Sequence, residues 1–294
     1  MKSILSISLL AVSGLIFGQE VPADTLWKKS GTLVFSLQQA GFTNWANGGI
    51  PSLAYGSVLN YSANRADENS TWNNSFQGAF GFLKQDEGEA RKNTDLLILT
   101  SEYGKNFSEN TQIAVGTDIR SQFAKGYVYS EDPNTGNEIK DLVSAFLSPG
   151  YVQTYLGLSY KKSNFNATIS PATNKLTFVL DETLSAAGSY GVDAGKKVRS
   201  QFGASLNAGY ASEVAENVSL KTNLMLFGDY AAFTQWDVNY DLFLDFKINK
   251  FLSTNFLLQM IYDHDIRGNN EIEGENGPAL QIRNVLNFGL TFSL

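Results

Sequence analysis

The chain has 294 residues, a net charge of −7 at pH 7 and no cysteine, so disulfides are excluded and an acidic chain is a poor candidate for nucleic-acid binding. Glycine (26), tyrosine (13) and phenylalanine (20) are abundant, whereas proline (6) is scarce and charged residues make up only 17%. Beyond residue 18 no apolar run reaches the roughly eighteen residues that a transmembrane helix needs. With a mean hydropathy of −0.16, this composition is typical of an outer-membrane β-barrel, whose strands face lipid on one side and a polar lumen on the other.

The first residues have the pattern of a secretory signal peptide. Lys2 precedes an apolar run from Ile4 to Phe17, and the small Gly18 precedes Gln19. We therefore expect cleavage after residue 18, which implies export. The domain organisation that follows is a signal peptide over 1–18, a periplasmic segment over 19–30 and a single barrel over 31–294.

Alternation of apolar and polar residues predicts about twelve membrane-crossing strands. A barrel strand needs about 9–11 residues with this alternation. The fold class expected is therefore all-β, a transmembrane antiparallel up-and-down barrel. The candidate strands span about 31–42, 52–63, 71–84, 94–107, 111–125, 150–161, 164–171, 199–212, 217–231, 236–248, 252–264 and 280–294.

The connections between these strands fall into two length classes. Those after even-numbered strands are short, for example "SEN" and "NK", and most of those after odd-numbered strands are long and polar, including 126–149 and 172–198. Outer-membrane barrels have short periplasmic turns and long outer loops. An even strand count then places both termini in the periplasm. A soluble sandwich also alternates but does not sort its turns by length in this way.

Strand parity assigns side chains to the two faces of the wall. Aromatic residues on the outer face gather near the short turns, which predicts a periplasmic aromatic girdle. The expected girdle residues are Tyr61, Trp72, Tyr103, Tyr160, Phe165, Tyr210, Phe246 and Phe292. The expected lumen-lining residues are Asp118, Arg120, Lys221, Asp229, Asp237, Asp241, Asp245, Lys247 and Arg283.

The last strand has an unbroken apolar face, formed by Leu286, Phe288, Leu290, Phe292 and Leu294. Outer-membrane lipid is the partner that accepts such a face, and pairing with the first strand would close the barrel. A terminal strand of this kind resembles the one that the outer-membrane assembly machinery recognises in outer-membrane proteins generally. We expect lipid and that machinery as partners, together with other outer-membrane proteins in one alternative, and no nucleic acid.

Several motifs resemble an uncharacterised outer-membrane family of Bacteroidota, DUF3078. They are "FTNWANGG" (42–49), "LSPGY" (147–151), "ISPATNKLTFVLDETL" (169–184) and "GSYGVDAGKKVRSQFG" (188–203), and the resemblance runs from about Trp27 to the end of the chain. It implies the barrel fold and the outer membrane of a Gram-negative cell. The family has no established activity, so the resemblance assigns no catalytic residue.

Candidate chemical groups each have a structural interpretation that we favour. The single histidine, His264, lies between Asp263 and Asp265, but adjacent strand residues point to opposite faces, which separates the groups that a dyad would need together. Glu271, Glu273 and Glu275, with these two aspartates or the loop 86–89, could bind Ca²⁺ through carboxylate oxygens, although the spacing of an EF-hand is missing. Solvated acidic loops are the simpler interpretation. "TNWANGG" has no lysine and no following helix, so a hairpin is favoured there over a phosphate loop.

These observations favour a narrow or loop-gated passage for small solutes, without enzymatic activity, metal or cofactor. The strand over 236–248 places three aspartates at four-residue intervals in the lumen, and cations from neighbouring walls could compensate them. Either such ion pairs brace the lumen, which we favour, or mobile ions fill a cation-leaning pore. A non-conducting interaction barrel is the alternative function, and a surface hydrolase is a weaker one.

Overall fold

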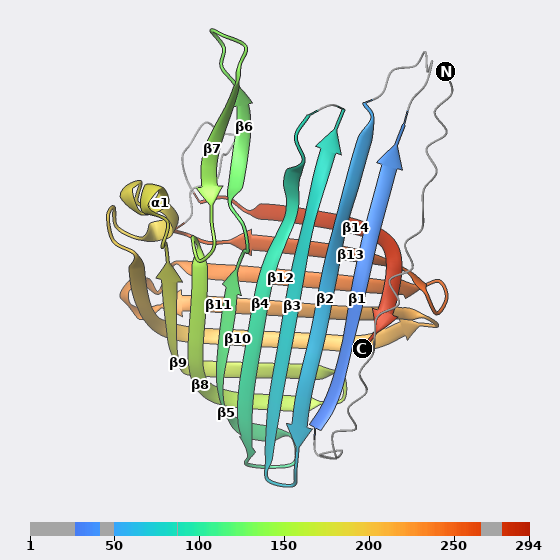
Figure 1. Ribbon diagram of the computed structural model, residues 1–294. Helices are drawn as coiled ribbons and strands as arrows, with labels where there is room; N and C mark the ends of the chain where they lie inside the picture. The colour runs from blue at the N-terminus through green and yellow to red at the C-terminus, as the bar shows by residue number, and fades with distance from the viewer. Residues whose placement is uncertain (1–26, 42–49, 87, 266–277) are drawn as a thin grey trace.

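The computed structural model describes residues 27–41, 50–86, 88–265 and 278–294. Twelve antiparallel strands form one closed barrel, in the order β1-β14-β13-β12-β11-β10-β9-β8-β5-β4-β3-β2. The strands β6 and β7 form a separate two-stranded sheet that projects from one end of the barrel (Figure 1). Strands of the front and back walls cross each other in the view, because the strands of a closed barrel tilt from its axis by about 35–45° (Figure 1).

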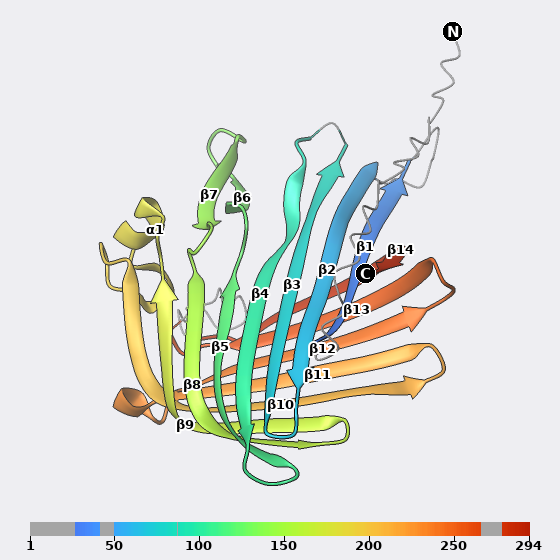
Figure 2. The same cartoon turned by 60° about the horizontal axis from the view of Figure 1, so that its bottom comes forward.

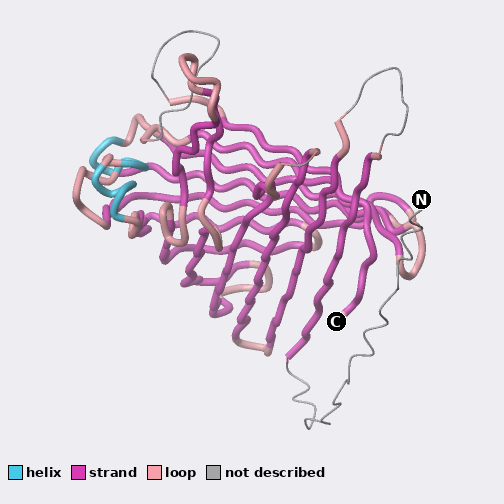
Figure 3. The backbone as a smooth tube through the Cα atoms, turned by 45° about the horizontal axis from the view of Figure 1, so that its top comes forward, coloured by secondary structure: helices cyan, strands magenta, loops and turns pink. Residues whose placement is uncertain are grey.

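Every strand of the barrel is long enough to cross a membrane, which takes about 9–11 residues. They are β1 Trp27–Ala40, β2 Ser52–Ala66, β3 Ser70–Gln85, β4 Arg91–Asn106, β5 Thr111–Ser121, β8 Gly150–Lys162, β9 Phe165–Phe178, β10 Val198–Ala215, β11 Val218–Asp229, β12 Trp236–Lys247, β13 Leu252–Tyr262 and β14 Gln281–Ser293. The projecting hairpin is β6 Gly126–Glu131 and β7 Glu138–Ser144. Three short helical turns complete the described chain: α1 Glu182–Ala186, η1 Ser189–Gly191 and η2 Tyr230–Ala232. Helix is confined to the loops (Figure 3), and no described helix has both the length and the apolar character to cross a membrane.

Each of the twelve predicted strands coincides with a barrel strand, which confirms the predicted fold class. Two connecting stretches need correction. The stretch 126–149 contains the hairpin β6–β7, and the stretch 172–198 contains the end of β9, α1 and η1. The first strand also begins at Trp27, which is 31 − 27 = 4 residues before its expected start.

A bulge in β9 explains why the alternation pattern predicts a loop for its second half. Ser205 of β10 pairs with Ser170, whereas Gly203 pairs with Thr173, so β9 holds an extra residue around Pro171. Proline has no N–H to give to a neighbouring strand, and an extra residue reverses the inward and outward alternation. The buried positions change accordingly from Thr168 and Ser170 to Thr173, Lys175 and Thr177.

Connection lengths sort the two ends of the barrel as predicted. One end has only the turns 67–69, 107–110, 163–164, 216–217 and 248–251. In the first of these turns, the backbone N–H of Asn69 and then the hydroxyl of Ser70 donate to the carboxylate of Asp67 and lower its pKa. The hairpin β6–β7 and the segment with α1 lie at the opposite end (Figure 2).

Aromatic side chains form two rings around the barrel, one near each of these ends. The eight residues of the expected girdle expose between 36% and 47% of their surface. Near the long loops, Tyr55 contacts Phe82 with ring centroids 5.7 Å apart, and Phe233 contacts Trp236 at 5.0 Å. Trp72 and Phe82 are 82 − 72 = 10 positions apart on β3, which corresponds to roughly 25 Å of barrel height at about 3.3 Å per residue and a tilt of about 40°. That height matches the apolar band of an outer-membrane barrel. The chain is thus a twelve-stranded transmembrane barrel, and the assignment of the eight residues to the periplasmic interface stays a prediction.

The register of β12 can be tested by cysteine labelling, because the chain has no cysteine of its own. Leu244 pairs with Leu220 and faces lipid by parity, whereas Asp245 is bonded by Asn255 inside the wall. We expect a water-soluble maleimide to label Asp245→Cys and to leave Leu244→Cys largely unlabelled in native membranes. The reverse pattern would show a register that is wrong by one residue.

Candidate functional site in the barrel lumen

Ion pairs join opposite walls of the barrel through the lumen. Arg120 on β5 donates from Nε to Oδ1 of Asp118 at 2.9 Å and from Nη1 to Oδ2 of Asp241 at 3.4 Å. Strands β5 and β12 are separated in the wall by β8, β9, β10 and β11. A contact between them can therefore form only across the interior. These three predicted lumen residues do meet inside the barrel.

The same cluster continues to the strands next to the seam of the barrel. Gln259 on β13 donates from Nε2 to Oδ1 of Asp241 at 3.0 Å, and Arg283 on β14 donates from Nη1 to Oε1 of Gln259 at 3.3 Å. Arg283 thus reaches the aspartate only through an amide. The cluster spans the lumen from β5 to β14.

A second cluster lies nearer the long loops. Nζ of Lys175 on β9 lies 2.6 Å from Oδ2 of Asp237 on β12 and 3.3 Å from Oδ2 of Asp263, which follows β13. The exposed fraction of each of the three side chains is below 10%. A buried lysine between two carboxylates holds a charge that the interior would otherwise exclude. This triad packs one part of the lumen closed.

Strand register connects the two clusters along one wall. Asp118 pairs with Gln153, Gln153 with Lys175, and Lys175 with Gln201 on four consecutive strands. All four residues are more than nine-tenths buried. They form a continuous polar belt on one wall, and the aspartates of β12 face it from the other.

A third group lies closer to the short turns. The hydroxyl of Tyr155 donates to Oε2 of Glu102 at 2.9 Å, the hydroxyl of Thr168 donates to the same oxygen at 3.2 Å, and Nζ of Lys161 lies 3.6 Å from Oε1. These contacts link β4, β8 and β9. They stiffen the wall there, because these four side chains hold one another through polar contacts.

The segment 179–197 lies at the mouth of the lumen on the side of the long loops, where Gly191 is next to Asp265. Its buried side chains Val179, Leu184 and Val192 pack against Leu142 of the hairpin. The hydroxyl of Tyr190 donates to the backbone carbonyl of Val143, and burial raises the pKa of that phenol.

This segment also contacts the charged wall beneath it. Nη1 of Arg199 lies 2.6 Å from Oδ2 of Asp265. A Cβ added at Gly191, whose φ is +72°, would lie 2.5 Å from that nitrogen, so only glycine fits there. The cap formed by residues 179–197 therefore sits directly on an ion pair of the mouth.

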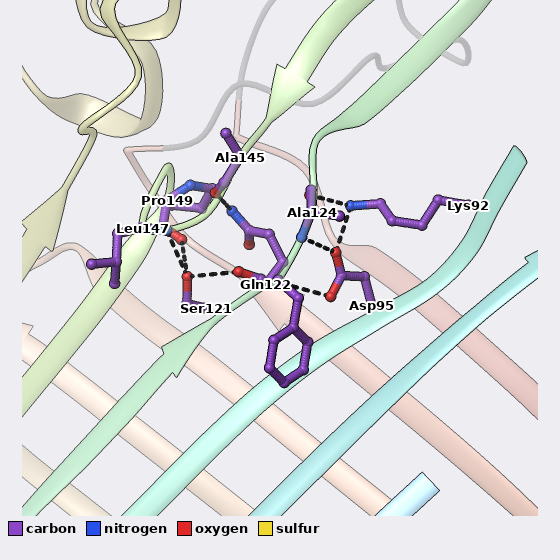
Figure 4. A network of polar contacts seen from close by, with 9 residues as sticks. Lys92, Asp95, Ser121, Gln122, Ala124, Ala145, Leu147 and Pro149 are labelled. Carbon is purple, nitrogen blue, oxygen red and sulfur yellow. Dashed lines mark hydrogen bonds and ion pairs between the residues drawn. The ribbon is translucent and has the colours of Figure 1, made fainter. Parts of the chain in front are cut away.

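A carboxylate of the wall holds the base of the hairpin (Figure 4). Asp95 on β4 accepts from the backbone N–H of Phe123 at 2.7 Å and of Ala124 at 2.9 Å, and its Oδ2 also accepts from Nζ of Lys92 at 2.7 Å. Next to it, Oγ of Ser121 accepts from the backbone N–H of Leu147 at 2.9 Å. Both ends of the long connection are thus fixed to the barrel.

The remaining predicted lumen residues have local or no polar partners. Asp229 accepts from Nε2 of Gln201 at 3.3 Å. Asp245 accepts from Asn255 on the adjacent strand. Lys221 and Lys247 are exposed, and among the described residues neither forms an ion pair within 4.0 Å, so their place in the lumen stays a prediction.

The groups that could suggest other chemistry are engaged or lie outside the described residues. Asp263 and Asp265 accept from Lys175 and Arg199, as their inward parity predicts, and no hydrogen bond joins the ring of His264 to a described residue. In the described part of the chain no group of three or more acidic or histidine side chains is arranged to hold a metal ion. The loop 42–49, with Trp45, and the three glutamates of 271–275 lie outside the described residues.

Sequence reasoning missed the most buried cation of the lumen, Lys175. Parity carried on from Phe165 and Ile169 would place position 175 on the lipid face, and only the bulge near Pro171 turns it inward. A proline inside an alternating segment is the one signal that could have indicated this shift.

Lys175→Met should destabilise the barrel more than removal of an exposed lysine does. It leaves Asp237 and Asp263 buried without their cation, and loss of one partner of a buried ion pair costs about 3–5 kcal/mol. Urea unfolding in lipid vesicles would measure the change in the free energy of unfolding. Lys221→Met is the matched control, and equal stability of the two variants would contradict the assigned role of Lys175.

The chain has distant similarity to known proteins. No curated protein matches the chain. An outer membrane channel from Pseudomonas putida F1 aligns over 94% of this chain and 100% of its own, with 14% identity and a TM-score of 0.40. The NanC porin aligns over 88% of this chain and 98% of its own, with 9% identity and a TM-score of 0.39. At these values the similarity concerns the barrel fold alone. Residues 37–127 match the model of the family described as "Protein of unknown function (DUF3078)", which confirms the resemblance over this part of the chain, including the motif at 42–49.

Proposed function

We propose that the chain is an outer-membrane passage for small solutes, narrowed by its own lumen charges and covered at its outer mouth by the cap 179–197. The observation that carries the proposal is the pair of cross-lumen clusters around Arg120 and Lys175. A barrel with no transport role could fill its lumen with apolar side chains. Buried charges are costly, and a path for polar solutes is a reason to keep them. The short-turn end, with both termini, would face the periplasm.

The charge balance of the clusters indicates which solutes would pass. Carboxylates outnumber cations by 6 − 4 = 2 in the lumen network formed by Asp118, Asp229, Asp237, Asp241, Asp263 and Asp265 with Arg120, Lys175, Arg199 and Arg283. A narrow, water-poor lumen with excess negative charge repels anions. The passage is therefore proposed for neutral or cationic solutes.

One observation favours the alternative, a non-conducting interaction barrel. The hairpin β6–β7 exposes Val128, Ile139 and Val143, with exposed fractions of 53%, 39% and 39%. Apolar groups on a projecting element are typical of binding surfaces. For a surface hydrolase no comparable observation exists, because the described acidic groups near His264 are held in ion pairs.

Conductance in planar bilayers separates the two functions. The double variant Asp237→Asn/Asp241→Asn removes one of the two carboxylate partners of each cross-lumen cation and leaves Asp118 and Asp263 in place. It should lower the melting temperature and raise the conductance above that of the unmodified protein, since the braces that narrow the lumen are weakened.

The control variant is Asp245→Asn, whose carboxylate is bonded only by the neighbouring Asn255. It should leave conductance and melting temperature nearly unchanged. Absence of conductance in all three proteins would reject the passage in favour of the interaction barrel. Loss of a cation preference without loss of stability would show that mobile ions, and not the protein's own cations, compensate these aspartates.

A further inference from the structure

The seam between the first and last strands is joined over only part of its length. Strands β1 and β14 pair from Thr32–Ser293 to Ser36–Gly289, which is five residue pairs, whereas every other neighbouring pair in the barrel has at least ten. At the joined part the backbones approach closely, since a Cβ at Gly289 would lie 2.2 Å from the carbonyl oxygen of Phe35. β14 runs along the back wall and approaches β1 only near its C-terminal end (Figure 1).

Beyond Ser36 the two strands separate. Continued register would pair Leu37 with Phe288 and Gln38 with Asn287, but among the described residues no such pair is formed. Residues Leu37–Ala40 pair only with β2, and Gln281–Phe288 pair only with β13. In an antiparallel sheet every second residue of an edge directs its N–H and C=O outward, so these edges carry backbone groups that no described strand pairs.

The separated part lies within the membrane. Phe292 belongs to the lower aromatic ring, and Ile282 is 292 − 282 = 10 positions above it on β14, the same spacing that separates the two rings on β3. The unpaired edge therefore extends from the middle of the apolar band to its outer margin. Unpaired backbone at that depth is tolerated only where it is buried in protein or lines a cavity that contains water.

The separated edges of β1 and β14 carry different side chains on their lipid face and on their lumen face. On the lipid side the edges expose Leu37, Leu286 and Phe288, with exposed fractions of 69%, 69% and 56%. On the inward side Ser36 and Asn287 are uncharged. The charge on this edge is Arg283, which is bonded to Gln259, while the ion pairs lie mainly on β5, β9 and β12.

We propose that the seam is a lateral opening through which apolar or amphipathic small molecules exchange between the lumen and the outer leaflet. The axial route is narrowed by charges that reject apolar solutes, and the opening in the wall is lined by groups that accept them. This inference rests on the proposed function in one respect, namely that the long-loop end of the lumen faces outward. It adds apolar or amphipathic molecules as a second class of solute for the same barrel.

Cysteine pairs can close the seam specifically, because the chain has no native cysteine. The test variant is Gln38→Cys/Asn287→Cys, treated with a bis-maleimide that spans a wider separation than a disulfide. Val34→Cys/Thr291→Cys reports the joined part of the seam, since these residues are register partners. Gln38→Cys/Ala54→Cys links the same position of β1 to β2 instead and leaves the seam free.

Two results are expected in cells that carry the protein in their outer membrane. The 34/291 pair should form a disulfide on mild oxidation and the 38/287 pair should not, because a disulfide requires Cα atoms within about 7 Å. Bridging 38/287 with the bis-maleimide should reduce uptake of the apolar fluorophore 1-N-phenylnaphthylamine to the rate of cells that lack the protein. Bridging 38/54 should leave uptake unchanged.

Other outcomes would overturn the opening. Equal disulfide formation at 34/291 and 38/287 would show a fully joined seam, and unchanged uptake after 38/287 is bridged would exclude the seam as a route. A covalent dimer of the single variant Asn287→Cys would assign the free edge to a second copy of the chain. Swelling of protein-containing liposomes in a neutral sugar, measured in parallel, reports the axial passage, so failure of one route is distinguishable from failure of the other.

Discussion

Ion pairs between opposite walls are the constraint on which the rest of this barrel depends. Arg120 and Asp241 belong to strands that are not neighbours in the sheet, and so do Lys175 and Asp237. Charges buried in a poorly hydrated lumen are stable only when each has a partner with good geometry. These contacts are compatible with the strand register, with the bulge in β9 and with the position of the cap. Without the contacts, the same arrangement would leave buried charges unpaired, which costs folding free energy.

The register of the strands decides which inward side chains lie next to each other in the lumen. The belt Asp118–Gln153–Lys175–Gln201 exists because four consecutive strands pair inward residues with one another. A slip of one residue would turn every side chain of a strand to the other face. The bulge near Pro171 makes this change once, inside β9, and thereby brings Lys175 to the aspartates of β12.

The fold was predictable from the sequence, whereas the key cation was not. Alternation in segments such as 236–248 locates strands because lipid and lumen impose opposite chemistry on successive residues. It also predicts that Arg120 and Asp241 share the lumen, and in the structure the two form an ion pair. Local alternation cannot reveal contacts across the lumen, the partner of Lys175 or the shortened pairing of β1 with β14, because these depend on how distant strands are placed around the closed wall.

The central claim is that ion pairs hold the two walls together, and a double-mutant cycle on Arg120 and Asp241 tests it most directly. Arg120→Met, Asp241→Asn and the double variant would be unfolded with urea in lipid vesicles and compared with the unmodified protein. The account predicts a coupling free energy of about 1.5 kcal/mol or more, as close charge pairs in poorly hydrated surroundings show. Additive effects, within about 0.5 kcal/mol, would show that the two walls do not interact through this pair and would contradict the account.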